Sequence, residues 1–103
     1  MCGICGFYSK KRETIGNLIE MNTTLIHRGP NAHGEEIYAG RTSEYGIGLS
    51  QRRLSIIDLS VRGHQPMHSF YKRVSLVFNG EIYNFQELKE ELGDYPFQSN
   101  CDT

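Results

Sequence analysis

The sequence lacks a long apolar run, a leader and any strong excess of charge. No apolar run approaches the roughly 18 residues that a membrane-spanning helix needs. The first residues also lack the basic region, apolar stretch and cleavage site of a secretory leader. Eleven Lys and Arg stand against twelve Asp and Glu, which gives a net charge of -1. These absences predict a cytoplasmic protein that binds neither membranes nor nucleic acids.

Cysteine is scarce, and its three copies are an odd number. We therefore expect free thiols rather than a disulfide framework. Cys2 and Cys5 form a C-x-x-C pair that could bind zinc together with a histidine, but structural zinc sites usually combine two such pairs and no second one is present. Inside a strand the two side chains would also point to opposite faces. The sequence thus predicts no metal site and no redox pair.

The apolar pattern predicts an α+β chain that forms one domain or part of one. A helix is expected over residues 15–26, ended by Gly29 and Pro30. A second helix should follow Asn84, which forms a capping pair with Glu87, and should end at Gly93. The expected strands are residues 2–8, 35–39, 45–50, 54–58, 74–78 and the start of one at 96–100. The run 74–78 is apolar on both faces, which is typical of a central strand.

The segment Met1-Cys2-Gly3-Ile4 can become a catalyst if Met1 is removed. A small second residue allows that removal, which leaves Cys2 with a free α-amino group. Such a group has an ordinary pKa of about 8, so it can take the proton of the thiol near neutral pH. The segment alone is equally compatible with a small buried residue near a frayed end.

Two further positions carry groups that suit the binding of an amino acid. Asn79, Gly80 and Glu81 follow an apolar run and bring together an amide donor, a flexible backbone N–H and a carboxylate. Arg53 could hold a carboxylate through its two-pronged guanidinium. Each has a plain alternative, because Asn-Gly is a common tight turn and a lone arginine is often a solvated charge.

Five segments in a fixed order give the chain a resemblance to a known family. They are Met1-Cys2-Gly3-Ile4, His27-Arg28-Gly29-Pro30, Arg53-Leu54-Ser55-Ile56-Ile57-Asp58, Gln65-Pro66 and Asn79-Gly80-Glu81-Ile82-Tyr83-Asn84. The chain resembles the N-terminal glutaminase domain of the glutamine-hydrolysing asparagine synthetases, a branch of the class II glutamine amidotransferases. The resemblance implies the N-terminal nucleophile hydrolase fold, an αββα sandwich of two antiparallel sheets.

The resemblance also implies roles for individual residues. Cys2 would attack the side-chain amide of glutamine with its own amine as base, and Asn79 with Gly80 would form the oxyanion hole. The substrate-binding residues would be Arg53 for the α-carboxylate, Glu81 and Asp102 for the α-ammonium, and the backbone of Leu54, Ser55, Ile56 and Ile57 along the pocket. The products would be glutamate and ammonia.

The sequence departs from the family pattern in two places and in length. Asn31 stands where aspartate is typical, and Gln51-Arg52 precede Arg53 where a histidine and a variable residue are usual. The resemblance implies that residues 1–103 are the N-terminal part of the glutaminase domain. It also implies that a synthetase domain, which uses ATP and Mg, is missing. The glutaminase itself would need no cofactor. The expected partners are glutamine and that synthetase domain, with self-association over uncovered strand edges. A non-catalytic fragment, or the glutaminase of another class II amidotransferase, remains an alternative.

Overall fold

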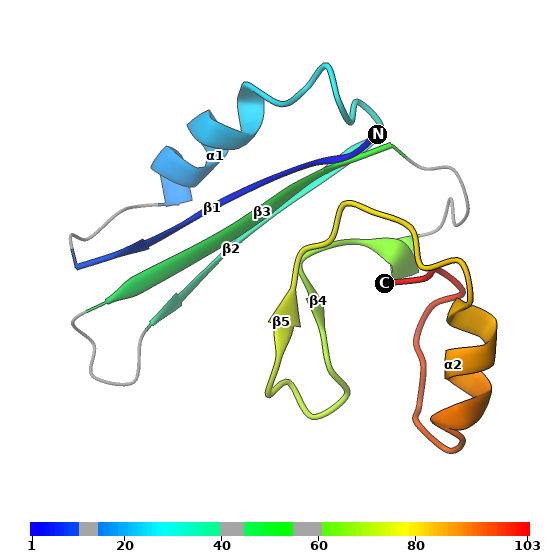
Figure 1. Ribbon diagram of the computed structural model, residues 1–103. Helices are drawn as coiled ribbons and strands as arrows, with labels where there is room; N and C mark the ends of the chain where they lie inside the picture. Colours follow the sequence, from blue (N-terminus) through cyan, green and yellow to red (C-terminus); the bar gives the residue numbers. More distant parts are fainter. Residues whose placement is uncertain (11–14, 40–44, 55–60) are drawn as a thin grey trace.

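The computed structural model describes residues 1–10, 15–39, 45–54 and 61–103 (Figure 1). The main sheet contains β1 (Gly3–Ser9), β2 (Ala32–Ala39) and β3 (Gly46–Arg53), all antiparallel in the order β1-β3-β2. A second, two-stranded sheet pairs β4 (Met67–His68) with β5 (Ser75–Leu76). The described part of the chain is therefore α+β with antiparallel sheets, as the sequence predicted.

Helix α1 (Ile15–Thr23) covers one face of the main sheet. Its Leu18 and Asn22 are completely buried, and the Asn22 amide donates to the Glu35 carboxylate of β2 over 2.5 Å. The helix ends three residues earlier than predicted. The hydroxyl of Thr23 donates to a carbonyl of the preceding turn, and from residue 24 the chain continues to Arg28 as turns. Such side-chain hydrogen bonds compete with the helical pattern, which explains the early end.

The opposite face of the main sheet receives the β4–β5 hairpin. His68 of β4 pairs with Glu36 of β2, with 2.8 Å between Nε2 and Oε2, and its ring lies edge-on to Tyr38. On the same face the Gln51 side chain of β3 donates to the carbonyl oxygen of Phe78. The described chain is thus layered as helix, main sheet and second sheet (Figure 1).

The prediction of a central strand over 74–78 was wrong. Only Ser75 and Leu76 pair, and Val74 is 62% exposed. The partner strand β4 can offer only a short ladder, because Pro66 directly before it has no N–H to donate. Directly after β4 the chain turns back through residues 69–73, where Lys72 has a positive φ of 55°. A strand can extend only as far as its partner pairs with it, so β5 stays short.

The other boundaries differ for local reasons. β2 and β3 are longer than predicted, and β3 ends at Arg53. A further strand was predicted over residues 54–58, of which residues 55–58 lie outside the described residues. The strand predicted at 96–100 does not form; the Lys89 ammonium donates to the Ser99 carbonyl there instead. The second helix is confirmed as α2 (Phe85–Glu91), with Gly93 at a φ of 54° after its end. Asn84 occupies the N-cap position but makes no capping hydrogen bond, so the predicted capping pair was wrong.

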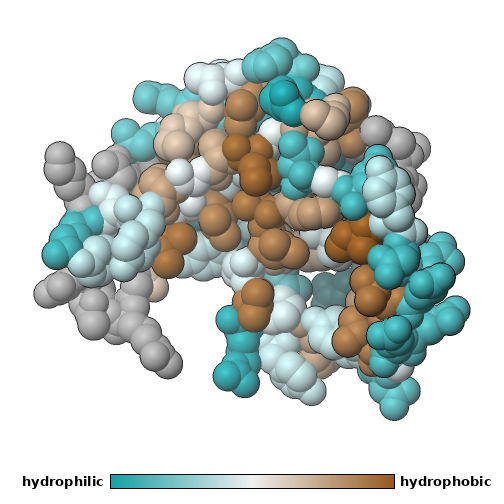
Figure 2. All heavy atoms as spheres, viewed as in Figure 1, coloured by the Kyte–Doolittle hydropathy of each residue, from teal (hydrophilic) through white to brown (hydrophobic). Residues whose placement is uncertain are grey.

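Little apolar surface is buried within the described residues. Leu18 is their only fully buried apolar side chain, whereas Ile4, Tyr8 and Leu76 are each 45% exposed or more. Figure 2 shows apolar side chains gathered in the middle of the viewed face. Self-association through such surfaces stays a prediction. None of the described helices is long and apolar enough to cross a membrane.

Candidate active site

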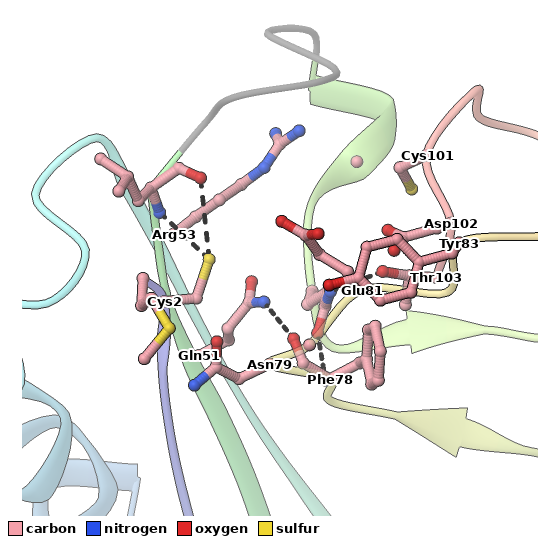
Figure 3. Close-up of a pocket in the computed structure, with 15 residues that line it drawn as sticks. Cys2, Gln51, Arg53, Phe78, Asn79, Glu81, Tyr83, Cys101, Asp102 and Thr103 are labelled. Atoms are coloured by element: carbon pink, nitrogen blue, oxygen red, sulfur yellow. Dashed lines mark hydrogen bonds between the residues drawn. The ribbon is translucent and has the colours of Figure 1, made fainter.

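A cavity of about 410 Å³ lies where the N-terminus, the end of β3, the turn after β5 and the last residues of the chain meet (Figure 3). The predicted site residues that line it are Cys2, Arg53, Leu54, Asn79, Gly80, Glu81 and Asp102. Residues 55–57, also predicted for this site, lie outside the described residues. The structure therefore brings the described ones among these residues, which come from four distant segments, together around one cavity.

The sulfur of Cys2 is held at the end of β3. The backbone N–H of Leu54 donates to Sγ over 3.3 Å, and Sγ lies 3.7 Å from the Leu54 carbonyl oxygen (Figure 3). The carbonyl of Cys2 accepts a hydrogen bond from Nε of Arg28 over 3.2 Å. These contacts fix the backbone and the sulfur of Cys2 beside the cavity.

The segment His27-Arg28-Gly29-Pro30 explains how the N-terminus reaches this place. Gly29 packs so closely on β3 that a Cβ there would collide with the backbone of Arg52. Two residues later, the N–H of Asn31 donates to the Arg53 carbonyl over 3.0 Å. The segment thus docks on the end of β3 while Arg28 holds Cys2. A glycine is needed because no side chain fits between the two backbones.

Charged groups of both signs line the cavity from different walls. Arg53 extends from the end of β3, and its guanidinium lies against Gly63 of the short 3-10 helix η1 (Val61–Gly63), where any side chain would collide with it. Glu81 comes from the opposite wall, and Figure 3 shows its carboxylate directed toward the space between Arg53 and Cys2. The arrangement can hold a molecule that carries an anion at one place and a cation at another.

The turn that carries Asn79 and Gly80 is connected to the end of the chain. Asp102 accepts a hydrogen bond from the N–H of Ile82 over 2.8 Å and is half-buried. This hydrogen bond ties Asp102 to the segment that follows the turn. Asn79 and Gly80 themselves are exposed at the cavity.

Sequence reasoning missed several residues of this site. The cavity is also lined by Met1, Gln51, Gly63, Gln65, Phe78, Tyr83, Cys101 and Thr103. Gln51 and Gln65 are 2% and 5% exposed. The two-residue period of a strand could have found Gln51, because it shares a face of β3 with Arg53.

Cys5 lies on the other face of the main sheet, as its spacing from Cys2 predicted. In β1 it pairs with Ser50, on the side that carries Glu35 and α1. Burial raises the pKa of the Cys5 thiol, and the charge of Glu35 raises it further, while a hydrogen bond with Ser50 opposes the shift. Cys5 is therefore a neutral thiol outside the cavity. Among the described residues, no group of three or more His, Cys, Asp or Glu side chains could hold a metal ion.

Comparisons with known proteins show which family the sequence matches. Residues 1–103 match the family model of the glutamine amidotransferase domain. The chain is 42% identical to a candidate glutamine-hydrolysing asparagine synthetase of Methanocaldococcus jannaschii, over 89% of this chain and 20% of that relative. It is 40% identical to asparagine synthetase B of Escherichia coli (99% and 18%) and 36% identical to asparagine synthetase 1 of Bacillus subtilis (100% and 16%), both glutamine-hydrolysing.

The chain spans only 16–20% of the length of these relatives. The family model, in contrast, matches from the first residue to the last. Because that match covers the whole sequence and the relatives are glutamine-hydrolysing enzymes, this chain belongs to the glutamine amidotransferase domain family.

Proposed function

We propose that this chain hydrolyses glutamine for an asparagine synthetase and releases ammonia and glutamate through a γ-glutamyl thioester on Cys2. One observation carries the proposal: a nucleophile, a cation, two carboxylates and an Asn-Gly turn line the same cavity of about 410 Å³. Ligand sites typically measure about 300–1,000 Å³, so a free amino acid is a suitable guest.

The two ends of glutamine call for opposite charges. Arg53 would bind the α-carboxylate, because a guanidinium matches the planar carboxylate with two hydrogen bonds. Glu81 and Asp102 would bind the α-ammonium from the opposite wall, and the hydrogen bond from Ile82 would hold the Asp102 carboxylate in place. With both ends fixed, the side-chain amide would point to the sulfur of Cys2.

The reaction then follows from the residues at the sulfur. The thiol of Cys2 gives its proton to the α-amino group and forms a bond to the amide carbon. The amide oxygen becomes an oxyanion that the Asn79 side chain and the Gly80 N–H would stabilise. The proton passes to the nitrogen, ammonia leaves, and a water molecule hydrolyses the thioester to glutamate with the same amine as base.

We further propose that the fold is that of the N-terminal nucleophile hydrolases. The layering of α1, the main sheet and the second sheet supports this, as does the position of Cys2 directly before β1. The glutaminase step needs no cofactor; ATP and Mg would serve a synthetase step performed by residues outside this chain. The partners are then glutamine and that synthetase domain, in the cytoplasm.

The proposal is tested with the natural polypeptide that carries this sequence. We expect its intact mass to lack Met1, which is 76% exposed and therefore accessible to removal. Glutamine should yield glutamate and ammonia in equal amounts, and a chloroketone analogue of glutamine should alkylate Cys2 and stop turnover. Full activity with Met1 retained, or alkylation of another cysteine at the moment activity is lost, would overturn the mechanism. A correctly processed chain without turnover would favour the non-catalytic alternative.

Replacing Arg53 with alanine should raise the KM for glutamine about 10- to 100-fold, which is the order of a lost charge-assisted hydrogen bond. The kcat should change little, because the α-carboxylate contact is the same in the ground state and the transition state. Steady-state kinetics measure this split. Arg73→Ala is the matched control, since Arg73 is exposed in the turn before β5 and outside the cavity. If Arg53→Ala lowered kcat alone, the assigned role would be refuted.

A further inference from the structure

Two buried glutamines hold the peptide groups on both sides of Phe78, the residue directly before Asn79. Gln51 of β3 donates from Nε2 to the Phe78 carbonyl oxygen over 3.0 Å. The Phe78 N–H donates to Oε1 of Gln65 over 2.6 Å. Both glutamines are at least 95% buried, so water does not compete for these hydrogen bonds.

The partners fix which way each side-chain amide points. A backbone carbonyl can only accept, so the NH₂ group of Gln51 must face Phe78. A backbone N–H can only donate, so the oxygen of Gln65 must face it. The NH₂ group of Gln65 is then directed away and donates to Oγ1 of Thr103 over 3.2 Å. The two glutamines therefore have different tasks at the same residue.

This network connects three walls of the cavity. Gln51 lies two residues before Arg53 on the same face of β3. Phe78 leads directly into the turn with Asn79 and Gly80, which is exposed and has no strand to hold it. Thr103 follows Asp102 at the third wall. The position of the exposed turn is thus set by two buried side chains rather than by the second sheet, whose strand β5 ends at Leu76.

We infer that Gln51 and Gln65 are positioning residues that fix the Asn79-Gly80 turn relative to Cys2 and Arg53. This inference rests on the proposed function, in which that turn stabilises the oxyanion. Gln51 acts through the Phe78 carbonyl, at the peptide bond whose N–H belongs to Asn79. Gln65 anchors the Phe78 N–H and couples the turn to the Asp102 segment.

The test is Gln51→Met. Methionine is uncharged and about as long as glutamine, but it lacks the NH₂ group that donates to the Phe78 carbonyl. Oxyanion donors act only when they are correctly placed, and a displacement of about 1 Å can cost about 100-fold in rate. We expect kcat to fall about 10- to 100-fold and the KM for glutamine to stay within about threefold, because Arg53, Glu81 and Asp102 remain in place. Gln51→His should recover much of kcat, since an imidazole N–H can donate to the same carbonyl.

Gln65→Met provides an independent second variant. It removes both the acceptor for Phe78 and the donor to Thr103. The kcat should therefore fall, and KM should rise as well, because Thr103, the residue after Asp102, loses its hydrogen bond to Gln65. Gln86→Met is the matched control for the same substitution, since Gln86 is exposed on α2 and outside the cavity. It should leave kcat and KM unchanged.

The outcomes separate this inference from the proposed function. All variants are measured in the natural polypeptide, and thermal melting checks that each is folded. If the unchanged protein hydrolyses glutamine and folded Gln51→Met has its full kcat, only the positioning role is overturned. A fall in kcat with a matching rise in KM, which Gln51→His does not recover, would show a merely structural role. That result would also overturn the positioning role. If the unchanged protein does not hydrolyse glutamine, the proposed function itself fails.

Discussion

Replacing Cys2 with serine should lower the glutaminase kcat by on the order of 1,000-fold or more, because the loss of a nucleophile removes the covalent route. The serine hydroxyl is far less ionised than a thiol near neutral pH, so the α-amino group has no reactive anion to generate. The structure gives the sulfur a defined place, with the Leu54 N–H 3.3 Å from Sγ. Binding of glutamine should persist in the variant, since the charged groups that hold its two ends are unchanged.

The two other cysteines provide controls for this experiment. Cys101 lines the same cavity, so Cys101→Ser tests whether any thiol in the cavity supports turnover. Cys5 lies on the opposite face of the main sheet, and Cys5→Ser tests for a general effect of losing a thiol. Both variants should retain activity. If Cys2→Ser turned over like the unchanged protein while either control did not, the assignment of the nucleophile would be wrong.

The parts of the structure that local patterns predicted best are those whose causes are local. The helix over residues 15–23 follows from apolar spacing, and the end of α2 follows from Gly93 at a positive φ of 54°. The opposite directions of Cys2 and Cys5 follow from the two-residue period of a strand. The residues proposed for the site came from the resemblance of five segments to a known family, and not from their spacing in the sequence. Apart from residues 55–57, which lie outside the described residues, all of the predicted site residues line one cavity.

The parts that were missed depend on contacts between distant segments. The run 74–78 has the composition of a buried strand, but its length is set by β4 and by Pro66 directly before that strand. Nothing within the run itself carries that information. Gln51 was noted only as a departure from the family pattern, and its hydrogen bond spans 27 positions to the Phe78 carbonyl. A glutamine in a strand reveals its partner only when the fold is known.

Replacing Asn79 with alanine should lower kcat by on the order of 100- to 1,000-fold, the usual effect of removing one oxyanion donor. The KM should change little, because the negative charge on the amide oxygen develops only in the transition state. Steady-state hydrolysis of glutamine measures both quantities. Asn84→Ala is the matched control, since Asn84 ends the same segment but its side chain makes no capping hydrogen bond to α2.

Asn79→Asp distinguishes the loss of the hydrogen-bond donor from a change in the shape of the side chain. An ionised aspartate has the same outline but can only accept, and its charge would repel the oxyanion. It should therefore reduce kcat at least as strongly as Asn79→Ala. If Asn79→Asp retained the kcat of the unchanged protein, Asn79 could not be an oxyanion donor. If Asn79→Ala instead raised KM and left kcat unchanged, the Asn79 amide would contact a part of glutamine that is the same in the ground and transition states.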